Sequence, residues 1–307
     1  MTLKKPNINL FIVGAAKSGT TSLYNYLAQH PEVFFPDVKE PNFYADAEAH
    51  NPSAYVKPKK GKFYHNKIIT DAAIYFSLYD GVKNQRIIAD SSPSYLWDLQ
   101  SAKRIQKDFP KAKIIMLLRN PTERAFSQFL MDLKDGNQTT TNFSQALKED
   151  AKTQPKTWGI AHLYTEIGLY HDQVKQYLDV FGNEQVKIIS YQDFINDTAK
   201  QLKDICEFLQ IDTAYIDTID YHKVYNPYVV PNGKMSKLLL SYKNKFGLLK
   251  LLVPKFIKEY LNTNILFKQE NKPKILPADK AYLNNFYAED IGKLEKLIQQ
   301  DLTQWKN

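Results

Sequence analysis

The stretch that decides the fold reads Phe11-Ile-Val-Gly14-Ala-Ala-Lys17-Ser18-Gly19-Thr20-Thr21-Ser22-Leu23. An apolar run typical of a buried strand leads into a turn bounded by Gly14 and Gly19, and a helical pattern begins at Thr20. Successive backbone N–H groups in such a turn bind a phosphate, and the N-terminus of the following helix attracts negative charge. The sequence therefore predicts a phosphate-binding loop between a strand and a helix.

The order of residues within this loop narrows its chemistry. In the loop of nucleoside triphosphatases, a lysine and a Ser or Thr follow the second glycine. Here Thr20 and Thr21 follow Gly19, and the lysine precedes it, at Lys17. The lysine that contacts β and γ phosphates is absent from its usual place. This order favours a nucleotide with a single 5′-phosphate, and a P-loop kinase or NTPase stays open as the alternative enzyme.

A second candidate nucleotide element follows the apolar run 112–118. Arg119 stands at its end, where ligands of open α/β sheets bind, and Pro121 suits the first turn of a helix. Ser127 lies two helical turns further on. Because a guanidinium offers paired donors to a phosphate, Arg119 with Ser127 is a candidate second phosphate site. For Arg124 we expect either a similar role or an ion pair with Glu123 or Asp90.

The remaining pattern predicts one α/β domain over residues 1–307, with a central parallel sheet flanked by helices. Four apolar runs rich in Ile, Val and Leu predict buried parallel strands: Ile8–Gly14, Arg86–Asp90, Ala112–Arg119 and Val186–Tyr191. Helical patterns follow three of them, at Thr20–Gln29, Thr122–Leu133 and Asp197–Leu209. Strands that alternate with helices are typical of a doubly wound fold.

Three regions depart from this alternation. Residues 46–67 and 135–159 are polar with few periodic apolar positions, and we expect them to be loop excursions on the acceptor side. Residues 234–307 form a basic, helical C-terminal region. In it, Pro277–Trp305 is expected to be one amphipathic helix, with one apolar face made of Tyr282, Phe286, Ile291, Leu294 and Leu297 or Ile298.

Composition excludes several classes of function. The net charge of +8 favours an anionic partner, but no nucleic-acid reader motif is present. The single cysteine, Cys206, predicts a core thiol, and no Cys/His cluster has zinc spacing. No run reaches the roughly 18 apolar residues of a membrane span, and no signal peptide is recognisable. We therefore expect a cytoplasmic protein that needs no metal, and peripheral membrane contact through the basic stretch Lys234–Lys258 is the alternative to a lid over the nucleotide.

With both phosphate elements identified, the sequence resembles the PAPS-dependent sulfotransferases (PAPS is 3′-phosphoadenosine 5′-phosphosulfate), in particular the branch of bacterial and heparan sulfate sulfotransferases. The resemblance runs in order from about residue 8 to the end. It is weakest over Tyr221–Pro277. It rests on the two phosphate elements and on six shorter matches: His30-Pro31, Lys39-Glu40-Pro41-Asn-Phe43-Tyr44, Asp90-Ser-Ser92-Pro93-Ser-Tyr95, Gly168-Leu-Tyr170, Ser190-Tyr-Gln-Asp193-Phe and Asp301-Leu-Thr-Gln-Trp305.

The resemblance implies a fold like that of P-loop NTPases and in-line displacement at sulfur, with 3′,5′-ADP leaving and no metal. It implies that Lys17 stabilises charge on the leaving phosphate and that Arg119 and Ser127 bind the 3′-phosphate. Tyr170 and Lys234 are weaker candidates for the donor pocket. The remaining contacts to the 5′-phosphate fall on the loop residues Ser18, Gly19, Thr20, Thr21 and Ser22.

The resemblance also implies that Glu40 is the general base. A pairing with Lys39 would argue against this, because catalysis near neutral pH needs a raised carboxyl pKa. Histidine is the competing base. His30 is expected to cap a helix end, and His162, His171 and His222 lack a motif. Asp90 is expected to orient the acceptor or Arg124, or to be structural.

The acceptor is expected to be a glycan or glycolipid. Aromatic and basic residues in and near the excursions suit a sugar site: Tyr44, Lys57–Lys62, Phe63, Tyr64, Tyr95 and Trp158. A non-catalytic module that binds nucleotide or glycan would keep the phosphate loop and dispense with Glu40. Oligomeric state, and O- against N-sulfation, are left open by the sequence.

Overall fold

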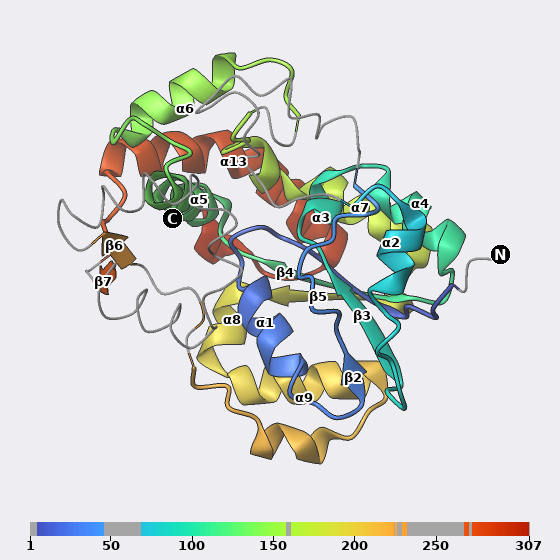
Figure 1. The fold of residues 1–307 in the computed structure, drawn as a ribbon. Helices are drawn as coiled ribbons and strands as arrows, with labels where there is room; N and C mark the ends of the chain where they lie inside the picture. Colours follow the sequence, from blue (N-terminus) through green and yellow to red (C-terminus); the bar gives the residue numbers. More distant parts are fainter. Residues whose placement is uncertain are drawn as a thin grey trace.

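The computed structural model describes residues 5–45, 69–157, 161–223, 225, 229–231, 267–269 and 272–306. Its centre is one sheet of parallel strands in the order β2-β3-β1-β4-β5 (Figure 1). The strands are β1 (Leu10–Gly14), β2 (Val33–Phe34), β3 (Ile87–Ser91), β4 (Lys113–Leu118) and β5 (Val186–Ser190). The four strands and the doubly wound α/β fold predicted from the sequence are confirmed.

Side chains alternate between the two faces of this sheet, as the period of a strand requires. In β1, Leu10 and Ile12 enter one hydrophobic cluster, and Phe11 and Val13 enter the other. All of these side chains are buried. Helices therefore cover both faces, which explains why the strands read as continuous apolar runs.

The helices divide between the two faces (Figure 1). One face carries α1 (Thr20–Leu27), α8 (Tyr191–Asn196) and α9 (Thr198–Leu209), and Cys206 of α9 is buried in this layer, as predicted. The other face carries α3 (Ser94–Trp97), α4 (Ser101–Asp108), α5 (Pro121–Asp135) and α7 (Tyr170–Phe181), with α2 (Ala72–Ser77) beside it. Short 3-10 turns span Glu166–Gly168, Asn183–Gln185, Thr213–Thr218 and Thr303–Trp305.

Residues 135–159 were predicted to be a loop excursion, and this is wrong for their middle part. Helix α6 spans Phe143–Lys152, and the Asn142 side chain caps it by accepting a bond from the amide of Gln145. Phe143, Ala146 and Leu147 are buried on one face of α6. The i, i+3, i+4 spacing of these three apolar residues is helical, but it is too short to stand out among polar neighbours.

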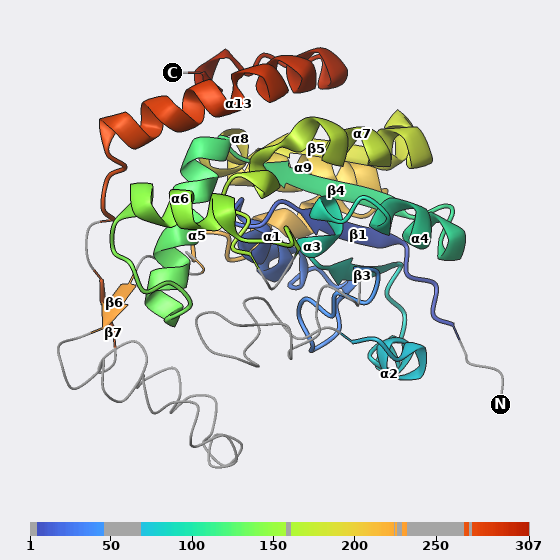
Figure 2. The same ribbon diagram turned by 90° about the horizontal axis from the view of Figure 1, so that it is seen from above.

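The C-terminal helix is present, but its expected length and apolar face were partly wrong. Helix α13 spans Pro277–Ile298 and ends before a separate 3-10 turn at Trp305. Ile291 and Leu294 are buried as expected, whereas Tyr282 and Phe286 are exposed. Leu283 and Tyr287 take their place in the core. Helix α13 itself contacts α7 and α5 and lies on the outer side of α7 in Figure 2. A shift of one residue rotates a helix by about 100°, enough to exchange the two faces.

The carboxyl ends of β1, β3, β4 and β5 meet at one edge of the sheet. After β1 the chain runs to β2 at one edge of the sheet, returns to β3 beside β1, and then crosses to β4 on the other side of β1, so β1 lies at the point where strand order reverses. Ligands of open α/β sheets bind outside such a switch point. A separate antiparallel pair joins β6 (Val229–Pro231) to β7 (Phe267–Gln269). None of the helices in the described ranges is long and apolar enough to cross a membrane.

Candidate active site

A cavity of about 1270 Å³ lies at this switch point. Its walls come from the loop after β1, from the segments that follow β4 and β5, and from α5. Among the residues that line it are most of the predicted site residues: Lys17, Gly19, Thr20, Thr21, Ser22, Glu40, Arg119 and Ser127. The structure thus brings together residues that are far apart in the sequence, on the expected edge of the sheet.

The loop Gly14–Gly19 has the geometry of a phosphate cradle. Gly19 has φ 91° directly before helix α1, a backbone conformation that glycine adopts without strain. Any Cβ at Gly14 would lie 2.6 Å from the Cβ of Leu96, so the close packing of strand and helix excludes a side chain there. The amides of Thr20, Thr21 and Ser22 fall in the first turn of α1, where helical N–H groups have no partner within the helix. These amides are the donors expected for a phosphate.

Lys17 extends from this loop toward α5. Its backbone has φ 68°, a left-handed conformation that is unfavourable by roughly 1–2 kcal/mol for a residue with a Cβ. Its Nζ lies 3.3 Å from the sulfur of Met131. Burial, and after it the nearby charge of Lys134, lower the pKa of Lys17 to about 8 against the opposing charges of Asp132 and Asp135. Burial makes the charged form of Lys17 unfavourable, so an anion bound beside its ammonium would stabilise that charge.

Arg119 is held in place on three sides. Its Nη2 donates to Glu123 at 2.9 Å and its Nη1 to the carbonyl of Lys17 at 3.4 Å. Its guanidinium carbon lies 4.7 Å from the centre of the Tyr191 ring, a distance that permits a cation–π interaction. The bond to Lys17 joins the second phosphate element directly to the first. Tyr191 itself follows β5, and the strand-end rule that identified Arg119 identifies Tyr191 too, although the sequence analysis gave it no role.

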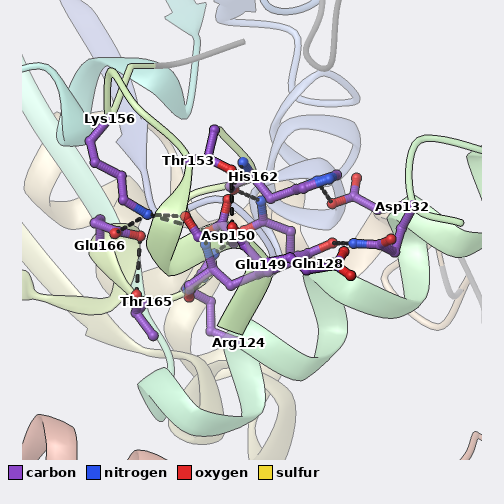
Figure 3. Close-up of polar contacts among 12 residues, drawn as sticks. Arg124, Gln128, Asp132, Glu149, Asp150, Thr153, Lys156, His162, Thr165 and Glu166 are labelled. Carbon is purple, nitrogen blue, oxygen red and sulfur yellow. Dashed lines mark hydrogen bonds and ion pairs between the residues drawn. The ribbon is translucent and has the colours of Figure 1, made fainter. Parts of the chain in front are cut away.

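Arg124 does not contact a candidate phosphate site, and its predicted pairing with Glu123 or Asp90 is wrong. It is fully buried. Its guanidinium donates to Gln128 and to the carbonyl of Tyr164, both at 2.6 Å (Figure 3). Gln128 in turn donates to the carbonyl of His162 at 2.5 Å. Arg124 therefore fastens α5 to the chain segment before α7.

Figure 3 shows that the same segment is also tied to α6. Asp150 of α6 accepts bonds from the amides of His162 and Tyr164, at 2.7 and 3.0 Å. The ring of His162 lies with its Nδ1 2.9 Å from Asp132, at the end of α5 that carries Met131. Because Gln128 and Met131 line the cavity, this polar network holds the cavity wall that faces Lys17.

Glu40 also lines the cavity, in a turn where it has φ 58°. It forms a short ion pair with Lys39, the pairing that the sequence analysis regarded as unfavourable for a base. The Lys39 ammonium also donates to the hydroxyl of Thr21 at 3.1 Å. Lys39 therefore connects the candidate base to the phosphate loop.

Two predicted site residues, Tyr170 and Ser18, are not among the residues that line the cavity, and a third lies outside the described residues. Tyr170 is fully buried, packs against Trp305 with ring centres 6.1 Å apart, and does not line the cavity. It interacts with Ser18 and Arg119 of the two phosphate elements, and its place in the donor pocket stays a prediction. Ser18 is also fully buried below the loop. Lys234 lies outside the described residues, as do residues 46–68, Trp158 and the whole of the basic stretch Lys234–Lys258.

The histidines in the described part of the chain lie in different environments. His30 is buried after the end of α1. Its ring accepts a bond from the amide of Glu32 and lies 2.8 Å from the carbonyl of Asp212, not on a carbonyl of α1, so the predicted capping role is not confirmed. His162 belongs to the network of Figure 3, and the ring of His171 lies 2.8 Å from Asp172. His222 lines the cavity. The cavity is also lined by three lysines that had no predicted site role: Lys39, Lys134 and Lys272. Lys39 had been considered only as a partner of Glu40, and no motif surrounds the other two.

Comparison with known proteins shows which family this chain resembles. A model of the sulfotransferase family matches residues 9–215. A sulfotransferase from Alicyclobacillus acidocaldarius of known structure is 28% identical, with a TM-score of 0.71, and the match covers 98% of this chain and 100% of that one. A membrane-associated sulfotransferase of Dictyostelium discoideum is 28% identical over 158 residues, 52% of this chain and 27% of that protein.

A bifunctional heparan sulfate N-deacetylase/N-sulfotransferase of Caenorhabditis briggsae is 22% identical over 214 residues. That match covers 68% of this chain and 23% of the relative. The chain thus spans about a quarter of the length of these two curated relatives.

Proposed function

This chain belongs to the sulfotransferase family, and on that premise we propose that it transfers a sulfuryl group from PAPS to a hydroxyl or amine of an acceptor. One observation carries the proposal: a single cavity contains the phosphate loop with Lys17, the arginine at the end of β4, and Glu40. Its volume of about 1270 Å³ exceeds the 300–1,000 Å³ typical of sites for one small molecule. That space suits a nucleotide donor together with part of an acceptor.

The residues present fit the two phosphates of the donor. The amides of Thr20, Thr21 and Ser22 would hold the 5′-phosphate, with the dipole of α1 behind them. Arg119 and Ser127 would hold the 3′-phosphate; the guanidinium is already oriented by Glu123 and by the Lys17 carbonyl. A guanidinium fixed before the ligand arrives loses less entropy on binding. PAPS supplies an activated sulfuryl group on a phosphate leaving group.

Lys17 would stabilise the negative charge that develops on the leaving phosphate. At pH 7 it is mostly protonated, because its pKa of about 8 lies one unit higher. Its desolvated ammonium interacts more strongly with an anion than a solvated one does, because the local dielectric is low. The thioether of Met131 is a weak acceptor, so contact with a phosphate oxygen would be the stronger interaction.

Glu40 would remove the proton from the acceptor. The ion pair with Lys39 stabilises its charged form, which lowers its strength as a base. However, Lys39 also contacts Thr21 of the phosphate loop. A bound 5′-phosphate would attract the same ammonium and weaken its hold on Glu40, so that donor binding prepares the base. Among the described histidines, His222 is the alternative base because it lines the cavity.

A carbohydrate is the acceptor class that we propose. One relative is by its name a heparan sulfate N-sulfotransferase, and Lys39 and Lys134 are among the side chains that line the cavity with Glu40. Such side chains bind sugar hydroxyls and the carboxylates of acidic sugars. A glycolipid belongs to the same class. Amine and hydroxyl acceptors would be distinguished by the linkage of the product.

Transfer of labelled sulfate from PAPS to N-desulfated heparin, which offers free amines and hydroxyls, tests this function. We expect incorporation by the wild type and a loss of about 10²- to 10⁴-fold in kcat for Glu40→Gln. The exposed Glu184→Gln variant serves as control and should keep full activity. Both variants should bind 3′,5′-ADP as the wild type does.

Full activity in Glu40→Gln would contradict the assignment of the base and direct attention to His222. Tight binding of 3′,5′-ADP without transfer to any amine or hydroxyl acceptor would instead identify a binding module.

Three broader expectations also belong to this proposal. The domain would extend over residues 1–307, with acceptor loops at 46–67 and around α6. A cytoplasmic location is proposed, with peripheral membrane contact through residues 234–258 as an added feature. Cell fractionation, and vesicle sedimentation with and without anionic lipid, are the measurements that separate these locations.

A further inference from the structure

Asp90, at the carboxyl end of β3, is a buried carboxylate that the reaction described above does not use. It is fully buried. Its Oδ1 accepts a bond from the hydroxyl of Ser92 at 2.7 Å, and its Oδ2 accepts bonds from the hydroxyls of Tyr75 at 2.8 Å and Tyr95 at 2.9 Å. Three hydroxyl donors, one from α2 and two from the stretch that follows β3, therefore converge on one carboxylate, an arrangement suited to its charged form.

A continuous chain of hydrogen bonds leads from Asp90 to the turn that carries Glu40. The hydroxyl of Ser92, fixed by its bond to Asp90, accepts a bond from the amide of Asn42 at 3.1 Å. The hydroxyl of Ser94 donates to Oδ1 of Asn42 at 2.5 Å. The side-chain amide of Asn42 then donates to the carbonyl of Glu40 at 2.7 Å. Every link in this chain has ordinary hydrogen-bond geometry.

The turn needs such support because two of its residues adopt left-handed backbone conformations. Glu40 has φ 58° and Asn42 has φ 54°. Asparagine tolerates this region because its short side chain bonds locally, whereas glutamate gains no such compensation. Left-handed residues persist when surrounding contacts determine the conformation, and they gather at functional sites.

We propose that Asp90 is the positioning residue for Glu40: through Ser92 and Asn42 it holds the strained turn that presents the Glu40 carboxylate to the acceptor side of the cavity. This role rests on the proposed function of Glu40 as base. Asp90 itself is not among the residues that line the cavity, so it acts through the turn.

The charge of Asp90 supports a functional reason for its presence. Burial, together with the smaller effect of the Glu40 charge, raises the pKa of Asp90 to about 6 against its three hydrogen bonds. The titratable groups that interact with it electrostatically are Glu40, Tyr44, Tyr75, Tyr79, Tyr95 and Tyr177. A carboxylate desolvated in this way destabilises the fold at neutral pH relative to a neutral isostere, so fold stability does not explain its presence.

Two variants and one matched control test this role. Asp90→Asn removes the charge with little change of shape, and Ser92→Ala removes the link to Asn42 while leaving Asp90 in place. Tyr177→Phe is the control, because it removes a buried hydroxyl bond (to the carbonyl of Tyr95 at 2.9 Å) from the same aromatic cluster without touching Asp90. The readouts are hydrogen exchange of the peptide that contains Asn42, transfer to N-desulfated heparin, the Kd for 3′,5′-ADP, and Tm.

We expect the Asn42 amide to exchange about tenfold faster in Ser92→Ala and in Asp90→Asn, because a bond that protects it is lost or weakened. In both variants kcat should fall about 10- to 100-fold through misplacement of the base. The Kd for 3′,5′-ADP should stay the same, and the Tm of Asp90→Asn should equal or exceed that of the wild type. The Tyr177→Phe control should keep wild-type exchange at Asn42 and wild-type kcat.

Unchanged exchange at Asn42 in both variants would overturn the role of Asp90. So would a fall in kcat that follows a fall in Tm or in nucleotide affinity, since that is the signature of a purely structural residue. If the wild type transfers no sulfate to the probe, the proposed function fails on its own, and the exchange measurement still decides whether Asp90 holds the turn.

Discussion

Lys17 is a site residue whose side chain loses its charge slightly above neutral pH. Its pKa is lowered to about 8, first by burial and then by Lys134. A lysine is cationic below its pKa, so attraction for an anionic donor is present at pH 7 and is lost as the pH rises through 8. Because kcat/KM reports the free enzyme, its pH profile should show this group directly.

We expect kcat/KM for PAPS to fall by about tenfold per pH unit above pH 8 in the wild type. Lys17→Arg should lack this alkaline limb, because a guanidinium stays charged. Lys134→Ala removes a neighbouring like charge, so the Lys17 pKa should rise and the limb should move to higher pH. A limb that stays at the same pH in both variants would belong to another group.

At the scale of elements, α6 shows where reading the sequence by pattern fails. Strands were predicted well because each is a short apolar run buried on both sides. Helix α6 has only three buried apolar residues, which the surrounding polar positions conceal. In α13, aromatic residues stand on both faces, so Tyr282 and Phe286 could not be told from Leu283 and Tyr287 without the position of α7. Packing partners, not local composition, decided both cases.

The packing of α6 gives an element-scale prediction. The ring of Phe143 lies 4.9 Å from that of Phe129 and 5.2 Å from that of Phe126, so α6 is fastened to α5 by aromatic contacts. Phe143→Ala should lower the free energy of unfolding by about 3–5 kcal/mol, as truncation of a buried aromatic residue does. The exposed Lys148→Ala should change it by less than about 0.5 kcal/mol. Urea denaturation of the two variants measures the difference; equal stabilities would mean that α6 is not part of the core.

On the scale of the whole molecule, the order of strands in the sheet explains which site residues could be predicted from the sequence. Lys17, Glu40 and Arg119 were identified from segments that end or follow strands, and parallel strands bring such segments to one edge. The role of Tyr170 stays a prediction, because a motif match does not show which way the first turn of a helix points. Lys39, Lys134 and Lys272 were given no role because their place in the cavity depends on tertiary folding alone. The chain from Asp90 to Glu40 likewise joins residues that only the fold brings together.

The central claim is that one cavity binds a nucleotide with two separate phosphates. Titration calorimetry of 3′,5′-ADP, with 5′-AMP and Mg-ATP as comparisons, tests it most directly. We predict metal-free binding of 3′,5′-ADP that is stronger than that of 5′-AMP. Arg119→Ala should lose about 2–3 kcal/mol of binding free energy through the missing charge-assisted bonds, and the exposed Arg86→Ala should bind as the wild type does. Equal affinity of Arg119→Ala and wild type, or binding of Mg-ATP in preference to 3′,5′-ADP, would contradict the claim.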